Sequence, residues 1–263
     1  MTGALAVTQP RVVQSEWIKL RSLRSTVYTL IAAVGMTVGL GILFCSVLVA
    51  RWGDMSPADR AGLSPVDFSL RGSFLAQLAV GVLGVLLITG EYTTGMIRAT
   101  ISAVPRRLPV LWAKLGTFAV VGSVVLIAAA VVAFLSGQAI LSSKGIGVSL
   151  FEHNVVRVVI GTGLYLTLVG LLGMVLGFII RNTAGAITAL FGIILILPVL
   201  GDVLPPDWAK HIVPYLPSVA GQGVMALHTD PGSLAPWTGF ALFAGYVAVG
   251  VVGAALSLRR RDA

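Results

Sequence analysis

Six long apolar runs, none of which contains Asp, Glu, Lys, Arg or His, limit how this chain can fold. They cover residues 27–50, 74–89, 115–135, 158–180, 184–200 and 237–258. A membrane-spanning helix needs about 20 apolar residues, and a continuously apolar run lacks the alternation of a barrel strand. The sequence therefore predicts an all-α polytopic membrane protein, in which six transmembrane helices form a single domain over residues 1–263.

Composition excludes the main alternatives to a membrane protein. Hydrophobic residues make up 57% of the chain and charged residues 11%, whereas soluble domains have about 45–50% and about 25%. Disorder requires low hydrophobicity and is excluded as well. The single cysteine, Cys45, excludes an intrachain disulfide.

The distribution of basic residues predicts the orientation. Of the 18 Lys and Arg residues, 12 fall on the side of the two termini and 6 on the other side. Basic residues gather on the cytoplasmic side of membrane proteins. We therefore expect a multi-pass protein of the cytoplasmic membrane with both termini in the cytoplasm. Because the basic residues form no continuous stripe, the net charge of +8 does not predict a nucleic-acid partner.

No motif for enzyme chemistry is present. The chain has no Gly-Lys dipeptide and hence no P-loop, and it has neither H-E-x-x-H nor G-x-S-x-G. Its three histidines are isolated on predicted loops: His153, His211 and His228. We therefore predict no catalytic residue, no metal ligand and no cofactor bound by this chain, which is not expected to be an enzyme.

Ion-coupled transport is also disfavoured. It usually requires charged groups at membrane depth, and the predicted spans have none. Glu91 and Asp202 lie at span ends, where we expect their carboxylates to reach water.

Two pairs of glycines have helix-packing spacing: Gly35 with Gly39, and Gly173 with Gly177. Small residues four apart let two helix backbones approach closely. Each pair could form a dimer contact or could pack within one subunit.

Residues 9–26 predict a basic amphipathic helix in the membrane interface. Val13, Trp17 and Leu20 share one face, although Ile18 interrupts the pattern on the other. A helix of this kind lies in the headgroup layer; the alternative is a plain polar tail. The expected interface residues are Val13, Trp17, Lys19, Leu20, Arg21 and Arg24.

The connection between the second and third runs predicts a short cytoplasmic helix. Ile97, Ile101 and Val104 recur at helical spacing, and Pro105 ends the pattern. Such a narrow apolar stripe could dock into a groove on a partner or could rest on the membrane surface.

A second irregular region follows the fifth run. Residues 201–236 contain six prolines around a moderately apolar stretch at residues 212–226. That stretch is too short to span and suits an interfacial or re-entrant piece.

These features together resemble a permease subunit of the type-two ATP-binding-cassette exporters, in the drug- and lipid-exporter class. The resemblance covers the whole chain and rests on three motifs. They are SEWIKLRSLRST at residues 15–26, EYTTGMIRAT at residues 91–100 followed by PRR and Lys114, and YLPSVAG at residues 215–221.

The resemblance implies an exporter complex of two permease and two ATPase subunits. The N-terminal helix would be an elbow at the inner leaflet, and the loop between the second and third spans would be the main coupling helix. The link Arg181–Thr183 would be a second, smaller contact. A separate P-loop ATPase would bind ATP and magnesium. The residues implied at the ATPase contact are Glu91, Tyr92, Gly95, Ile97, Arg98, Ile101, Val104, Arg106, Arg107 and Arg181.

Within this picture, Glu91 is expected to hold the entry angle of the loop through a hydrogen bond or ion pair. The uncharged spans suit an amphipathic drug or lipid-like cargo, and the expected partners are the ATPase, a second permease and membrane lipids. The alternative function is a non-transport membrane scaffold or sensor.

Overall fold

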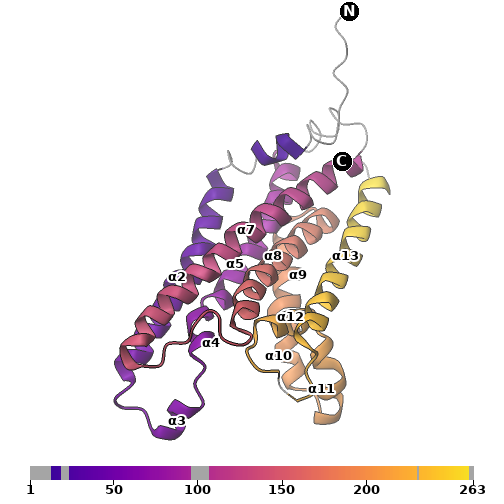
Figure 1. Cartoon of the computed structure of the whole chain (residues 1–263). Coiled ribbons are helices and arrows are strands. Elements are labelled where there is room, and N and C mark those ends of the chain that lie inside the picture. The colour runs from indigo at the N-terminus through magenta and orange to yellow at the C-terminus, as the bar shows by residue number, and fades with distance from the viewer. Residues whose placement is uncertain (1–12, 19–23, 96–106, 230, 261–263) are drawn as a thin grey trace, which may run out of the picture.

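The computed structural model (Figure 1) describes residues 13–18, 24–95, 107–229 and 231–260. These residues are mostly helical and contain no strand, and six segments are long and apolar enough to cross a membrane. Helices suit this setting because every backbone donor and acceptor in hydrocarbon must bond within the chain. The prediction of an all-α polytopic membrane protein is confirmed.

The long helices account for the six candidate spans. They are α2 (Arg24–Arg51), α5 (Ser73–Thr93), α7 (Arg107–Leu141), α8 (Val155–Ile180), α9 (Thr183–Phe191) continued by the π-helical η2 (Gly192–Ile196) and α10 (Leu197–Asp202), and α13 (Pro236–Arg260). Shorter helices lie between them: α3 (Pro57–Ala61), α4 (Pro65–Leu70), η1 (Ser142–Lys144), α11 (Pro206–Ile212), η3 (Val213–Tyr215), α12 (Pro217–Gln222) and η4 (Gly223–Met225).

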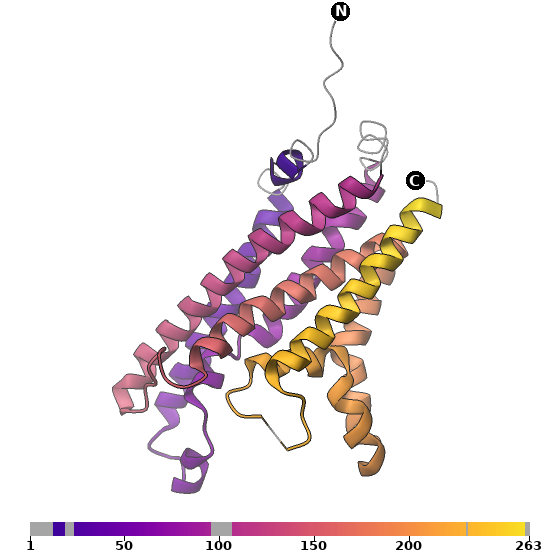
Figure 2. The same cartoon turned by 45° about the vertical axis from the view of Figure 1, so that its right-hand side comes forward.

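Helix α8 lies at the centre of the bundle. Helices α5 and α7 pack along it, α13 and α9 contact it as well, and α2 lies against α5 and α7. Figures 1 and 2 show that α2 begins and α13 ends at the same end of the bundle. We call this the terminal end, and we call the opposite end, which carries α3 and α11, the loop end.

Glycines allow α5 and α8 to touch backbone to backbone. A Cβ atom on Gly84 would collide with the carbonyl oxygen of Gly170, and one on Gly173 would collide with that of Gly81. Small residues are used in this way where membrane helices cross closely. A Cβ atom on Gly177 would likewise meet Ile88 and Val85 of α5.

Of the two alternatives for Gly173 and Gly177, packing within one chain is therefore confirmed. Gly35 and Gly39 differ, because a Cβ atom on either would meet nothing within 4 Å. A dimer contact at this second pair stays a prediction.

The stretch at residues 212–226 turns back into the bundle. Helix α12 packs against α13 and α8, and its Ser218 and Gly221 are buried. Arg157 of α8 donates to the carbonyl oxygens of Val224 at 3.2 Å and Ala226 at 3.1 Å. Irregular backbone at membrane depth is tolerated where protein surrounds it, so these contacts fit the re-entrant alternative.

All six candidate spans are longer than the apolar runs that predicted them, and the second and third differ most. The second candidate span is Pro65–Thr93 and includes Glu91, while the third is Leu108–Lys144 and includes Lys114. The apolar runs themselves are uncharged as expected, but most of the full candidate spans carry charged residues toward their ends. Of these, Glu91 and Lys114 pair with each other.

Candidate functional site

Three charged side chains meet at the terminal end, between the short helix at residues 13–18 and helices α5 and α7. The ammonium Nζ of Lys114 donates to Glu16 Oε2 at 2.7 Å and to Glu91 Oε1 at 2.6 Å. All three residues are buried, with exposed fractions of 3% for Glu16 and 6% for each of the other two. We call this group the charge triad.

The charge triad fixes position more than it adds stability. Taking charges out of water costs several kcal/mol per ion, and only close, well-oriented pairing offsets that cost. Any arrangement that separates the members leaves a buried charge without its partner. The triad therefore holds the short helix at residues 13–18 in one place relative to α5 and α7.

The triad also joins the two helices that flank one connection. Glu91 lies in the last turn of α5, and Lys114 lies two turns into α7. The chain between these helices, residues 94–106, is the connection predicted to carry the short cytoplasmic helix. A displacement of this connection would therefore strain the triad.

A second contact joins the same turn of α5 to the link between α8 and α9. The guanidinium carbon of Arg181 lies 5.2 Å from the centroid of the Tyr92 ring. Its Nη2 donates to the carbonyl oxygen of Ser257 in α13 at 3.2 Å. Arg181 ends α8 with a left-handed backbone (φ 58°), which turns the chain sharply into α9.

A third contact lies one turn earlier in α5. The hydroxyl of Thr183, the first residue of α9, donates to Thr89 Oγ1 at 2.9 Å. The last two turns of α5 thus contact α7 and α9 directly, and Lys114 and Arg181 connect them to the short helix and to α13.

Of the residues expected at an ATPase contact, Glu91, Tyr92 and Arg181 come together here. Gly95 follows the end of α5 with φ 71°, a left-handed conformation that glycine adopts without strain. Arg107 begins α7, but its side chain is outside the described part of the chain. The remaining expected residues lie outside the described residues: Ile97, Arg98, Ile101, Val104 and Arg106.

Glu91 makes the ion pair expected of it, but the expectation that its carboxylate reaches water is wrong. Lys114 replaces water as its partner. The α5 helix end is covered by neighbouring helices, a tertiary feature that hydropathy along one segment does not reveal.

The short helix at residues 13–18 turns Glu16 inward. Glu16 is the buried residue among these six, whereas Val13 and Trp17 are exposed and free to contact lipid. Arg24 begins α2 with its side chain outside the described residues. Lys19, Leu20 and Arg21 also fall outside them.

Sequence reasoning quoted Glu16 and Lys114 within motifs but assigned neither a role. One signal was available: each is a single charge next to an apolar run, and their signs are opposite. Nothing in the sequence indicated that residues 98 positions apart would meet, since only the packing of the helices brings them together.

A second buried polar cluster lies nearer the loop end. The hydroxyl of Tyr165 in α8 donates to Gln77 Oε1 in α5 at 2.7 Å and accepts from Gln222 Nε2 in α12 at 3.2 Å. These bonds anchor the re-entrant α12 to the central helices.

Within the described residues, no group of three or more His, Cys, Asp and Glu side chains is placed to hold a metal ion. The residues brought together by the structure thus offer ion pairs and hydrogen bonds between helices. The chain matches no protein-family model, and it has no significant match among the curated proteins.

Proposed function

We propose that this chain is the membrane-spanning permease subunit of an ATP-binding-cassette exporter, driven by a separate P-loop ATPase. In this proposal the subunit works as a dimer in the cytoplasmic membrane, with the terminal end in the cytoplasm. Its cargo is an amphipathic drug or lipid-like molecule.

The observation that carries the proposal is the convergence of contacts on the last turn of α5. A partner that displaces residues 94–106 would pull on Glu91 and Lys114 together, because both flank that connection. Through Glu16 the displacement would reach the interfacial helix. Through Tyr92 and Arg181 it would reach α13.

The arrangement of charge supports the same proposal. Within the described residues of the terminal end, Lys114 of α7 pairs with Glu91 of α5 and with Glu16. A relay for protons or sodium would need ionisable groups continuing along the membrane path. The energy for transport is therefore assigned to a partner.

Co-purification from the native host tests the ATPase partnership. Two charges in the predicted docking stripe, Ile97→Asp with Ile101→Asp, should release the ATPase while the permease still inserts. The reason is that a carboxylate buried against an apolar groove without a partner is strongly unfavourable.

A matched control comes from the loop end, where Trp208 and Ile212 of α11 are exposed at the same spacing. Trp208→Asp with Ile212→Asp should retain the ATPase at equal membrane expression. If the stripe variant also retains it, this loop is not the main contact. If no ATPase accompanies the parent protein, or if a protonophore abolishes transport by this chain alone, the proposal is wrong.

Orientation is tested separately by labelling cysteines with an impermeant thiol reagent. In a Cys45→Ser background, cysteines at Ser102 and Ser142 should react from opposite sides of the membrane, with Ser102 on the cytoplasmic side. Labelling of both from one side would contradict the orientation.

A further inference from the structure

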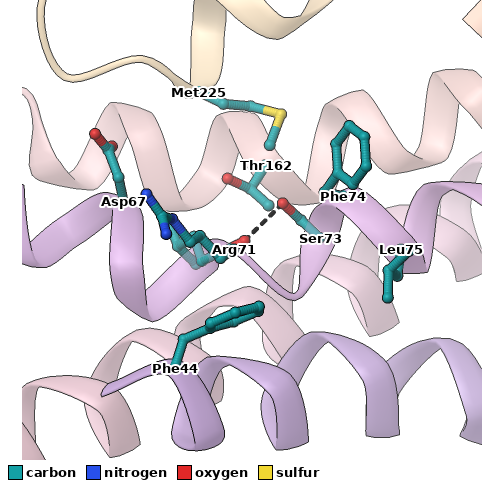
Figure 3. A pocket seen from close by; sticks show the side chains of 9 residues that line it. Phe44, Asp67, Arg71, Ser73, Phe74, Leu75, Thr162 and Met225 are labelled. Carbon is teal, nitrogen blue, oxygen red and sulfur yellow. Dashed lines mark hydrogen bonds between the residues drawn. The ribbon is translucent and has the colours of Figure 1, made fainter. Parts of the chain in front are cut away.

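A pocket of about 500 Å³ opens at the loop end, where α4 meets α5. Leu70, Ser73 and Thr162 form its buried floor, while Phe74 and Leu75 on its rim are 56% and 44% exposed. Figure 3 shows the charged side chains of Asp67 and Arg71 on one side and the apolar rim on the other. We call it the interfacial pocket.

The hydroxyl groups of the floor are already satisfied. Ser73 donates to the carbonyl oxygen of Leu70 at 2.7 Å, and Thr162 donates to that of Val158 at 2.8 Å. Polar recognition in the pocket therefore depends on its two charged residues.

Aromatic rings hold the Arg71 guanidinium in place. Its carbon lies 4.0 Å from the centroid of Phe68 and 6.0 Å from that of Phe44, both within the range of cation–π contacts. Such contacts orient a cation but leave its N–H groups free to bind an anion.

Asp67 supplies the opposite charge one helical turn away. Both residues are exposed and line the same pocket, yet the ion pairs found among the described residues involve Lys114 and neither of these two. The charged side of the pocket thus presents a cation and an anion that do not form an ion pair with each other.

The pocket lies near the loop-end limit of the second candidate span, Pro65–Thr93. Helix α5 has 21 residues from Ser73 to Thr93, a length of about 30 Å at the usual rise, which matches the hydrocarbon thickness of a bilayer. With α5 taken as the part of this span that crosses the hydrocarbon, Phe74 and Leu75 lie at one boundary, and Arg71 and Asp67 lie beyond it in the headgroup layer.

We propose that the interfacial pocket binds a zwitterionic phospholipid. Its phosphate would lie at Arg71 and its ammonium group at Asp67, while the first part of an acyl chain would lie against Phe74 and Leu75. The pocket fits this lipid because the charged side of the pocket would meet the headgroup and its apolar side would meet the acyl chain. The inference goes beyond the proposed function and does not rest on it.

Native mass spectrometry of the purified protein in detergent tests the site. The protein is titrated with phosphatidylethanolamine, phosphatidylglycerol and diacylglycerol of identical chains. The parent should bind phosphatidylethanolamine most tightly and diacylglycerol least tightly. Arg71→Gln should weaken binding of both phospholipids about tenfold, the loss expected for one charge-assisted contact at a partly exposed site.

Asp67→Asn separates the two charges. It should weaken binding of phosphatidylethanolamine several-fold but leave binding of phosphatidylglycerol unchanged or stronger, so that the order of the two reverses. Arg71→Lys, which keeps the cation, should retain most of the preference for phospholipid over diacylglycerol. The thermal unfolding midpoints of Arg71→Lys and Arg71→Gln, compared with each other, show whether either variant is misfolded.

Arg51→Gln and Asp54→Asn are the matched controls, since both residues are exposed at the loop end but do not line the pocket. They should leave the three affinities unchanged. Equal binding of all three lipids by the parent would overturn the proposal, as would a full phospholipid preference in Arg71→Gln. A third outcome would also overturn it: Phe74→Ala dissociates a dimer of this chain, and added lipid leaves the parent dimer intact. A second copy of the chain would then fill the pocket.

Discussion

The middle of the bundle and its terminal end are held together in different ways. In the middle, α5 and α8 touch where Gly84 faces Gly170, and no charged side chain takes part in this contact. At the terminal end, the contact between α5 and α7 runs through the ion pair of Glu91 and Lys114. Close packing of small residues stabilises the contact between α5 and α8, and an ion pair stabilises the contact between α5 and α7.

The difference has a physical consequence. A close apolar contact is lost gradually as helices shift, whereas a buried ion pair penalises every arrangement in which its partners separate. The middle therefore tolerates small helix shifts, whereas the terminal end favours the one arrangement that keeps its charges paired. The four predictions below test this contrast, in order of decreasing effect.

Removing the cation of the charge triad should have the largest effect. Lys114→Met leaves the carboxylates of Glu16 and Glu91 buried without their shared partner, which should destabilise the protein by about 3–5 kcal/mol. Unfolding in mixed detergent and SDS micelles measures this loss.

The triple variant Glu16→Gln, Lys114→Met, Glu91→Gln removes all three charges. Its stability should return toward that of the parent, because the three charges of the triad are removed together. If the proposed function is right, the ATPase coupling of this variant should nevertheless be lower than that of the parent. If Lys114→Met alone unfolds like the parent, charge does not hold the terminal end.

Adding a methyl group at the helix crossing should have the next largest effect. In Gly84→Ala the new Cβ atom collides with the backbone of α8, and forced overpacking costs about 1–3 kcal/mol. Gly90→Ala is the control on the same helix, where a Cβ atom meets nothing within 4 Å. The same unfolding assay should show Gly90→Ala at or slightly above the parent, and equal losses in both variants would refute close packing at the crossing.

A loss of similar size is expected at the polar cluster of the bundle interior. Tyr165→Phe leaves the buried Gln77 without its hydroxyl donor, at a cost of about 1–3 kcal/mol for a buried unsatisfied group. Tyr246→Phe is the control, since its exposed hydroxyl bonds the carbonyl oxygen of Tyr215 in reach of water. Similar stabilities of the two variants would show that the cluster contributes little.

The smallest effect is expected at the link between α9 and α5. Thr183→Val removes one partly buried hydrogen bond to Thr89, worth about 0.5–1.5 kcal/mol. Thr188→Val, on the exposed side of α9, should change stability by less. If the proposed function is right, Thr183→Val should reduce ATPase coupling by more than its effect on stability explains, because it loosens one contact of the α5 turn.

Hydropathy predicted the number of spans because each crossing has to be apolar over its own length, and no knowledge of neighbours is needed. It placed the start of the third span at residue 115, one residue after a charge. In the structure α7 begins at Arg107. The discrepancy arises because a helix can continue beyond its apolar run, and here Lys114 is paired with carboxylates from two other segments, which the local pattern does not contain.

The sequence alone determined that this chain is a helical membrane protein and which segments cross, since the transfer of apolar residues from water to hydrocarbon depends only on local composition. Only the tertiary structure decided which charges are buried and which glycines pack against which helix. Glu16, Glu91 and Lys114 are stable inside the protein because three separate segments meet there. Their pairing is a property of the packed bundle, because the cost of burying each charge is offset only by partners that are distant in the chain.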